Sequence, residues 1–306
     1  MFNIVRRRYL FFALSALVIV PGLVGLFLWG LPLAIDFTGG NLLEIRFEAG
    51  TPPPPADVVA FLEARGVGDP TTQSAGTSDL IIRSRPIEES IRLTLLADLQ
   101  AQFGGPLTVL RDERVGPSIG AEVAQRAAGA VGLAVVGILA YITYAFRGVT
   151  HAFRYGVAAI AAMLHDVAVV VSVESLLGHF LGWEVDSLFL TALLTVIGFS
   201  VHDTIVVFDR IRENQRLHRR LPYETLVNHS IVQTLARSIN TQLTVMLTLL
   251  ALLLFGGVTT QHFVTILLIG VFSGTYSSIF NAAPILVVWE NREWRTWFGR
   301  RTPAAA

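Results

Sequence analysis

Six long apolar runs and one long polar interval make up the chain. The first run extends from Tyr9 to about Ile35, and the others lie near 127–146, 153–177, 187–208, 241–258 and 263–289. Each is long enough to cross a hydrocarbon core of about 30 Å. The first run is longer than the apolar part of a signal peptide, and no small-x-small cleavage site closes it. Residues 1–35 are therefore predicted to form an uncleaved first membrane span.

The polar interval at 36–126 has the periodicity of a small α+β domain. Partial alternation predicts strands at 41–48, 71–74, 79–84 and 107–114, and amphipathic patterns predict helices at 58–65 and 86–103. The proline run at 51–57 is expected to be a stiff connector. This order of elements predicts a ferredoxin-like domain. The predicted fold class is an all-α six-helix membrane bundle with an inserted extramembrane α+β ferredoxin-like domain.

Composition and charge support a membrane protein and orient it. The 306 residues are 53% hydrophobic and 15% charged, with a mean hydropathy of +0.58, which is too apolar for a soluble domain. The net charge is zero, so nothing indicates a nucleic-acid partner. All 23 basic residues are arginines, and the short loops at 178–186 and 256–262 contain none.

The positive-inside rule then predicts that both termini are cytoplasmic. The arginines that mark the cytoplasmic side are Arg6, Arg7, Arg8, Arg147, Arg154, Arg210, Arg212, Arg216, Arg219, Arg220, Arg237, Arg292, Arg295, Arg300 and Arg301. In this topology residues 36–126 are external, and 127–290 form a five-span bundle with a cytoplasmic linker at 209–240. Residues 291–306 form a cytoplasmic tail.

Two spans carry the same dipeptide in apolar surroundings. His165-Asp166 lies near the middle of the third span, and His202-Asp203 lies about 10 Å inside the cytoplasmic edge of the fourth. A charge at such depth costs at least about 2.5 kcal/mol. One interpretation is a proton relay, because low dielectric disfavours the charged carboxylate. The other is a structural aspartic acid that hydrogen-bonds across helices. We favour proton transport for Asp203, leave Asp166 open, and expect the histidines to be packing residues.

Arg237 is the candidate counter-charge for Asp203. It lies at the start of the fifth span, where topology alone would make it a positive-inside anchor. Our hypothesis is that it reaches Asp203 and forms an ion pair that is made and broken during a cycle. Residues 221–238 are predicted to form an interfacial or connecting helix that continues into the fifth span. Glu174 is predicted to be interfacial. Close helix packing is predicted for Gly270, Gly274, Gly129 and Gly132.

Other chemistries are disfavoured. Without cysteine there are no disulfides, thiolate metal sites or cysteine nucleophiles. The two His-Asp pairs offer metal ligands, but neighbouring residues do not share one helix face, so no metal is predicted. An aspartyl protease would need both carboxylates to share a proton, and no glycine beside either Asp opens the backbone. There is no P-loop. We therefore predict neither an enzyme nor a bound cofactor.

Several motifs resemble those of one family. Ile35-Asp-Phe-Thr-Gly-Gly40 follows the first span, Val115-Gly-Pro-Ser-Ile-Gly120 precedes the second, and VIGFSVHDTIVVFDRIREN lies in the fourth. Tyr223-Glu224, Asn240-Thr-Gln and Leu254-Phe-Gly-Gly257 continue the match through the last third of the chain. On these motifs the chain resembles the SecF family of the resistance-nodulation-division superfamily.

The resemblance implies a function. SecF proteins are similar to half of a twelve-span unit, which implies a SecD partner, association with the SecYEG channel, and use of protons to help preproteins leave that channel. It implies a multi-pass protein of the bacterial inner membrane. The family's functional Asp and Arg fall on Asp203 and Arg237, and a third-span Asp of less defined duty falls on Asp166. His202 stands where Asn is common, which leaves open whether it tunes proton affinity.

Two other functions stay open at this stage. One is a proton-driven exporter of small molecules or lipids in the same superfamily, which the single small external domain disfavours. The other is a structural assembly subunit without ion flux.

Overall fold

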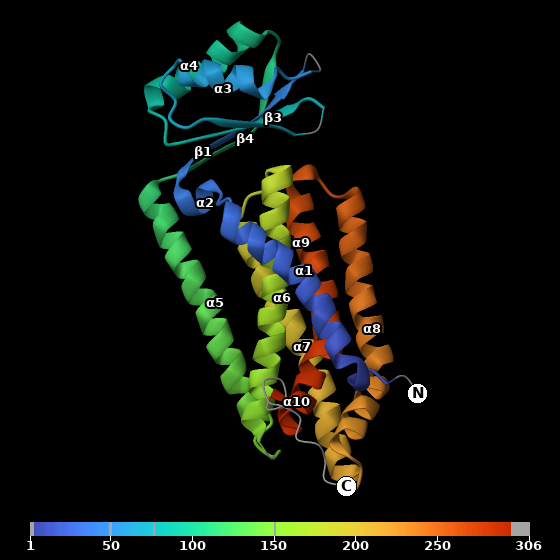
Figure 1. The fold of residues 1–306 in the computed structure, drawn as a ribbon. Helices are drawn as coiled ribbons and strands as arrows, with labels where there is room; N and C mark the ends of the chain where they lie inside the picture. The colour runs from blue at the N-terminus through green and yellow to red at the C-terminus, as the bar shows by residue number, and fades with distance from the viewer. Residues whose placement is uncertain (1–2, 49–50, 76, 150, 295–306) are drawn as a thin grey trace. The chain divides into compact units, whose positions relative to one another are not determined.

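The computed structural model describes residues 3–48, 51–75, 77–149 and 151–294. These divide into two compact units, of which one is Pro32–Gly129 with Glu184–Ser187 and the other contains the long helices. Figure 1 labels the elements of both units. The predicted tail at 291–306 falls almost wholly outside the described residues, as do Arg295, Arg300 and Arg301.

Six stretches of the described chain are long and apolar enough to cross a membrane, as the sequence predicts. The chain is therefore a multi-pass membrane protein. Five of these stretches are α1 (Arg8–Trp29, preceded by the 3-10 turn η1, Val5–Arg7), α5 (Pro117–Ala145), α6 (Ala152–Leu181), α7 (Ser187–Leu217) and α8 (Tyr223–Phe255). The sixth consists of α9 (Val258–Ser277), the π-helical segment η2 (Ser278–Ala282) and α10 (Ala283–Glu290).

Several helix ends differ from the sequence prediction. The first span ends at Trp29 rather than near Ile35, because Gly30 adopts a positive φ of 75° that stops the helix. The helix of the second span begins at Pro117, well before the apolar run, since proline is favoured in a first turn. Residues 223–255 form one unbroken helix, so the predicted connecting helix does continue into the fifth span.

Helices α6, α7 and the sixth span form the centre of the bundle, with about half of the residues in their apolar windows buried. In the other three spans few residues of the apolar windows are buried within the described chain. Figure 1 draws α8 at the outer edge of the helices. Gly270 lies against Val196, and Gly274 lies against Ser200, so α9 approaches α7 closely as predicted. Within the described residues the prediction for Gly129 and Gly132 is wrong, because a Cβ atom on either would meet no described neighbour within 4 Å.

The π-helical segment η2 has an identifiable cause. Pro284 lies at the start of α10, where it lacks an N–H group and crowds the carbonyl one turn earlier. A wider turn relieves that conflict without ending the span. π-Bulges are frequent at functional sites, and Ser278 within this one contacts Thr204 of α7, with 2.9 Å between the two hydroxyl oxygens.

Ion pairs join three helix ends at one end of the bundle. Arg8 at the start of α1 contacts Glu293, which follows α10, at 2.6 Å, and Glu224 at the start of α8 at 3.3 Å. The beginning of the first span and the end of the sixth therefore lie on the same side, as an even number of spans requires.

The second unit has the predicted order of strands and helices. Its elements are α2 (Ile35–Thr38), β1 (Gly40–Phe47), α3 (Pro55–Glu63), β2 (Thr71–Ala75), β3 (Asp79–Ser84), α4 (Glu89–Phe103) and β4 (Leu107–Val115). The four strands form an antiparallel sheet in the order β2-β3-β1-β4. Ile45, Leu62, Leu80 and Leu99 are fully buried between the sheet and the two helices. The expected stiff connector ends early, because Pro55 already begins α3.

Two of the family-like motifs contact each other in this unit. A Cβ atom on Gly39 would lie 2.7 Å from Cα of Pro117, and one on Gly120 would lie 2.8 Å from the amide nitrogen of Gly39. Gly39 and Gly40 also have positive φ values of 74° and 144°. Glycine is therefore required both by backbone conformation and by close approach at the start of β1.

The loop between α6 and α7 belongs to the same unit. Val185 pairs with Leu33 in a parallel bridge, and the amide of Ser187 donates to Asp36 at 2.8 Å. Arg83 of β3 lies 2.8 Å from Glu184. Burial raises the pKa of the Glu184 carboxyl, and the charge of Arg83 opposes that rise.

Candidate functional site

Asp203 is buried on α7 and faces α8. Its side chain lies against Ser238 and Gln242, which are one helical turn apart on α8. All three residues are at most 3% exposed. Both side chains are polar contacts of the carboxyl, but these contacts lack regular hydrogen-bond geometry. Within the described chain, Oδ2 of Asp203, Oγ of Ser238 and Oε1 of Gln242 are each buried without a partner of that geometry. Buried polar atoms are almost always hydrogen-bonded, so three free ones in a single cluster call for an explanation.

The helical repeat of α7 explains why Asp203 points inward. Ser200 and Val207, about one turn before and after it, share its face and are buried. His202 projects about 100° away around the helix and is exposed. Asp209 is also exposed, beyond the apolar part of the helix. On this one helix the fold therefore buries the carboxyl of Asp203 and leaves His202 and Asp209 exposed.

The structure does not bring Arg237 to Asp203. The Arg237 side chain is exposed and makes no ion pair within the described chain, although Ser238, the next residue, faces the carboxyl. Neighbouring residues project about 100° apart on a helix, so the guanidinium lies beside the site rather than in it. The unpaired state is the one seen here.

Asp166 on α6 is fully buried and fully hydrogen-bonded. Its Oδ2 accepts from Ser200 at 2.5 Å and from Ser277 at 2.6 Å. Its Oδ1 accepts from Ser273 at 2.7 Å and from the ring Nδ1 of His165 at 3.0 Å. We call this arrangement the Asp166 cage. It joins α6, α7 and α9 through charge-assisted hydrogen bonds, which are the strong ones.

His165 extends the Asp166 cage to the first span. Its Nε2 lies 2.9 Å from Oγ of Ser15 on α1, and that oxygen also accepts from Asn281 at 3.1 Å. A carboxylate can only accept, so the ring Nδ1 is the donor to an ionised Asp166, and Nε2 faces a hydroxyl that can either donate or accept. The contact between the adjacent residues His165 and Asp166 was not predicted from the sequence.

Ser200 connects the cage with the second site. Its hydroxyl donates to Asp166, while its backbone carbonyl accepts from Thr204 at 3.0 Å and from Ser278 at 3.1 Å. Thr204 is the neighbour of Asp203. A continuous strip of polar groups therefore extends along the inner face of α7 from one aspartate to the region of the other.

Glu174 is a third buried carboxyl. Its side chain is fully buried among the helices, and its predicted position near the membrane interface stays a prediction. Its Oε2 lies 2.9 Å from Nε2 of His262 on α9, and its Oε1 has no partner. The ring of His262 packs on Trp183, with 4.7 Å between centroids. Two features of the sequence could have indicated this pair. They are a single Glu within an apolar run and a single His near the start of the last span.

The described residues contain no group of three or more His, Cys, Asp and Glu side chains that could hold a metal ion. The buried carboxyls instead offer hydrogen-bonding and proton-accepting positions. Asp166 has all four of its acceptor positions occupied, whereas Asp203 has a free oxygen beside two further free oxygens.

Sequence comparison now adds to this geometry. Residues 96–292 match the family described as protein export membrane protein SecD/SecF, C-terminal, and residues 27–51 match the SecD/SecF GG motif. The chain is 56% identical over 308 residues to the protein translocase subunit SecF of Anaerolinea thermophila, with all of both chains covered. The chain belongs to the SecF family. Its relatives are named as subunits of a protein translocase, so its role is to support protein export and is not enzymatic.

A longer relative shows the same fold. The protein translocase subunit SecDF of Thermus thermophilus is 39% identical over 275 residues, which are 86% of this chain and 35% of that protein. The crystal structure of SecDF from this organism, described as a translocon-associated membrane protein, matches with a TM-score of 0.85 at 37% identity, over 95% of this chain and 39% of that one. A SecDF structure in a super-membrane-facing form matches with a TM-score of 0.69. The resemblance inferred from the motifs is confirmed.

Proposed function

We propose that this chain is the SecF half of a proton-driven complex that assists protein export. Its partner would be SecD, because the chain spans 35% of a relative named SecDF. Association with the SecYEG channel fits the description of that relative's structure as translocon-associated. Preproteins emerging from the channel would be the cargo. The arginine distribution supports an inner-membrane topology with cytoplasmic termini.

Asp203 is the proposed proton carrier. The observation that carries this assignment is its buried, unpartnered oxygen beside the unpartnered oxygens of Ser238 and Gln242. A protonated carboxyl needs an acceptor for its own O–H, and both neighbours offer one. A carboxylate at the same place could accept from the Ser238 hydroxyl and the Gln242 amide, but it would be a buried charge without an ion pair in the described chain. The cluster therefore suits a group that is neutral in this state and charged in another.

Arg237 is the proposed counter-charge of that other state. It has no ion pair within the described chain and lies next to Ser238 on the helix that faces Asp203. A modest rotation of α8 would bring its guanidinium toward the carboxyl, and pairing would then favour release of the proton. His202 is exposed beside Asp203 and is proposed to adjust its proton affinity.

Asp166 stays a candidate for proton transport, but its four hydrogen bonds favour a holding role in this conformation. Protons could move along the polar groups that Ser200 connects on the inner face of α7 only if hydrogen bonds of the Asp166 cage were broken.

We further propose that residues 36–126 form a ferredoxin-like external domain that meets the preprotein. The element order and the sheet order β2-β3-β1-β4 support that fold. Its movement during the cycle is consistent with the existence of a second form of SecDF, described as super-membrane-facing.

The deciding experiment is export into membrane vesicles that carry the chain with its SecD partner, with and without an imposed proton gradient. We expect Asp203→Asn and Arg237→Met to remove the gradient-dependent part of export, by at least about tenfold. Asp209→Asn is the matched control, since it removes an exposed carboxylate six residues along the same helix. Full gradient dependence in both site variants would reject proton transport and favour a structural subunit.

A further inference from the structure

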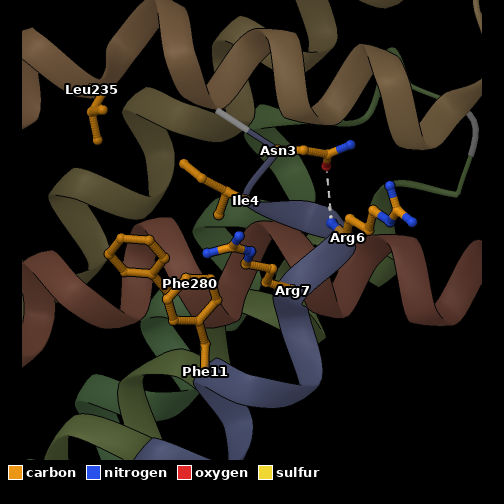
Figure 2. Close-up of a pocket in the computed structure, with 7 residues that line it drawn as sticks. All are labelled: Asn3, Ile4, Arg6, Arg7, Phe11, Leu235 and Phe280. Carbon is orange, nitrogen blue, oxygen red and sulfur yellow. Dashed lines mark hydrogen bonds between the residues drawn. The ribbon is translucent and has the colours of Figure 1, made fainter. Parts of the chain in front are cut away.

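A pocket lined by none of the buried carboxyls lies at the arginine-rich end of the bundle. It measures about 790 Å³, which falls within the range of ligand sites. Its lining residues, shown in Figure 2, are Asn3, Ile4, Arg6, Arg7, Phe11, Leu235 and Phe280. They come from the beginning of the first span, from α8 and from η2. Most of the lining is apolar, and its two guanidinium groups belong to Arg6 and Arg7.

The two arginines are uncompensated. Arg6 and Arg7 are exposed and make no ion pair within the described chain. Their neighbour Arg8 differs, because Glu224 and Glu293 both contact it. In the view of Figure 2 the Arg7 side chain extends toward Phe280, while Arg6 extends to the opposite side of the N-terminal segment. Two adjacent cations without an ion pair in the described chain, beside an apolar pocket, suit an anionic partner with an apolar part.

The pocket is built from anchored elements. The backbone amides of Ile4 and Val5 donate to the side-chain oxygen of Asn228, which fixes η1 to α8. The rings of Phe11 and Phe280 contact each other at a tilt of 36° with 4.3 Å between centroids, and the hydroxyl of Tyr276 donates to the carbonyl of Phe11 at 2.7 Å. A preorganised wall costs little conformational entropy on binding.

We propose that this pocket binds an anionic glycerophospholipid. Its phosphate would contact Arg7, Arg6 would add positive charge beside it, and an acyl chain would lie over Phe11, Phe280 and Leu235. The charge complementarity and the position favour a lipid, because the arginines directly precede an apolar span and therefore lie at headgroup level. Basic pockets between spanning helices on the arginine-rich side are suited to such headgroups. If Arg6 and Arg7 served only to orient the first span, their charges would be sufficient and no pocket beside them would be needed.

The test is retention of phosphatidylglycerol by the purified full chain, measured by native mass spectrometry in an equimolar mixture with phosphatidylcholine. We expect one bound phosphatidylglycerol, and at least a fivefold loss in Arg6→Gln/Arg7→Gln, with Arg7→Gln contributing more than Arg6→Gln. Arg219→Gln/Arg220→Gln is the matched control, because it removes two adjacent exposed arginines that do not line the pocket. Leu235→Trp should also lower retention while leaving both charges in place.

Thermal melting of each variant separates loss of binding from loss of folding. Unchanged phosphatidylglycerol retention in the double variant, or equal retention of phosphatidylcholine by the unmodified chain, would overturn the proposal. So would complete displacement by millimolar inorganic phosphate, which would indicate a free-anion site. A polypeptide that occupies the pocket in place of lipid and is released by Leu235→Trp would likewise overturn it.

Discussion

The two His-Asp dipeptides have the same sequence and opposite surroundings. Asp166 accepts four hydrogen bonds, three of them from serines on neighbouring helices. Asp203 is equally buried but has an unpartnered oxygen next to two others. The histidines differ as well, since His165 completes the Asp166 cage whereas His202 is exposed. A buried carboxyl is therefore not informative by itself, because the number of partners decides whether it holds the bundle or stays available for a proton.

The largest expected effect comes from removing the charge at each aspartate. Asp166→Asn places an amide NH₂ group against serine hydroxyls that now donate to a carboxylate, so we expect a loss of at least about 3 kcal/mol of stability. Asp203→Asn should change stability by less than about 1 kcal/mol, since it breaks no hydrogen bond. Thermal unfolding in detergent measures both. Equal destabilisation of the two variants would remove the distinction between the sites.

A serine pair tests the same comparison with less disruption. Ser277→Ala removes a 2.6 Å hydrogen bond to the Asp166 carboxylate and should cost about 1.5–3 kcal/mol. Ser238→Ala removes a buried hydroxyl without a partner and should be neutral or slightly stabilising. The difference between the two melting curves is the measurement. A large loss of stability in Ser238→Ala would show that the Ser238 hydroxyl has a hydrogen-bond partner in solution. Asp203, Ser238 and Gln242 would then not be a cluster of unpartnered oxygens.

Glu174 gives an intermediate case, because one of its oxygens is paired and the other is free. His262→Ala leaves the carboxyl without any partner and should cost about 1–3 kcal/mol. Glu174→Gln keeps one hydrogen bond to the ring and should cost about 1 kcal/mol or less. Thermal unfolding again reports both effects. The reverse order of the two variants would indicate that the free oxygen of Glu174 has a partner in the membrane.

The smallest effect concerns an ion pair outside the spans, which shows how water changes the comparison. The two hydrogen bonds from Arg46, at 2.7 and 2.8 Å, lower the pKa of Asp79. Because the pKa is lower in the folded state, this stabilisation is complete above the unfolded value, near pH 4. It is lost as pH falls through the folded value. The pair is partly exposed, so we expect no more than about 1 kcal/mol.

Hydrogen exchange of the β1 and β3 amides between pH 6 and pH 3, with Asp79→Asn as the reference, measures this effect. The variant should show a flatter dependence of protection on pH after correction for intrinsic exchange rates. Identical profiles would mean that the pair contributes nothing to the sheet.

The sequence determined the six spans through its apolar runs and the strand and helix order of the external unit through local periodicity. Its short motifs determined the family. It also located Asp166 and Asp203. The helix ends at Gly30 and Pro117 were missed because backbone conformation and first-turn preference extend beyond the hydropathy signal.

Tertiary structure alone decided the roles of the individual polar groups. Nothing in the sequence pairs Ser273 and Ser277 with Asp166, because those contacts join residues more than 100 positions apart. The burial of Glu174 and the exposure of Arg237 likewise depend on which helix faces which. Periodicity reports that a residue lies within a span, but only packing determines how many donors surround it. Where water is absent, the number of hydrogen-bond donors around a carboxyl determines whether it holds helices together or stays available for a proton.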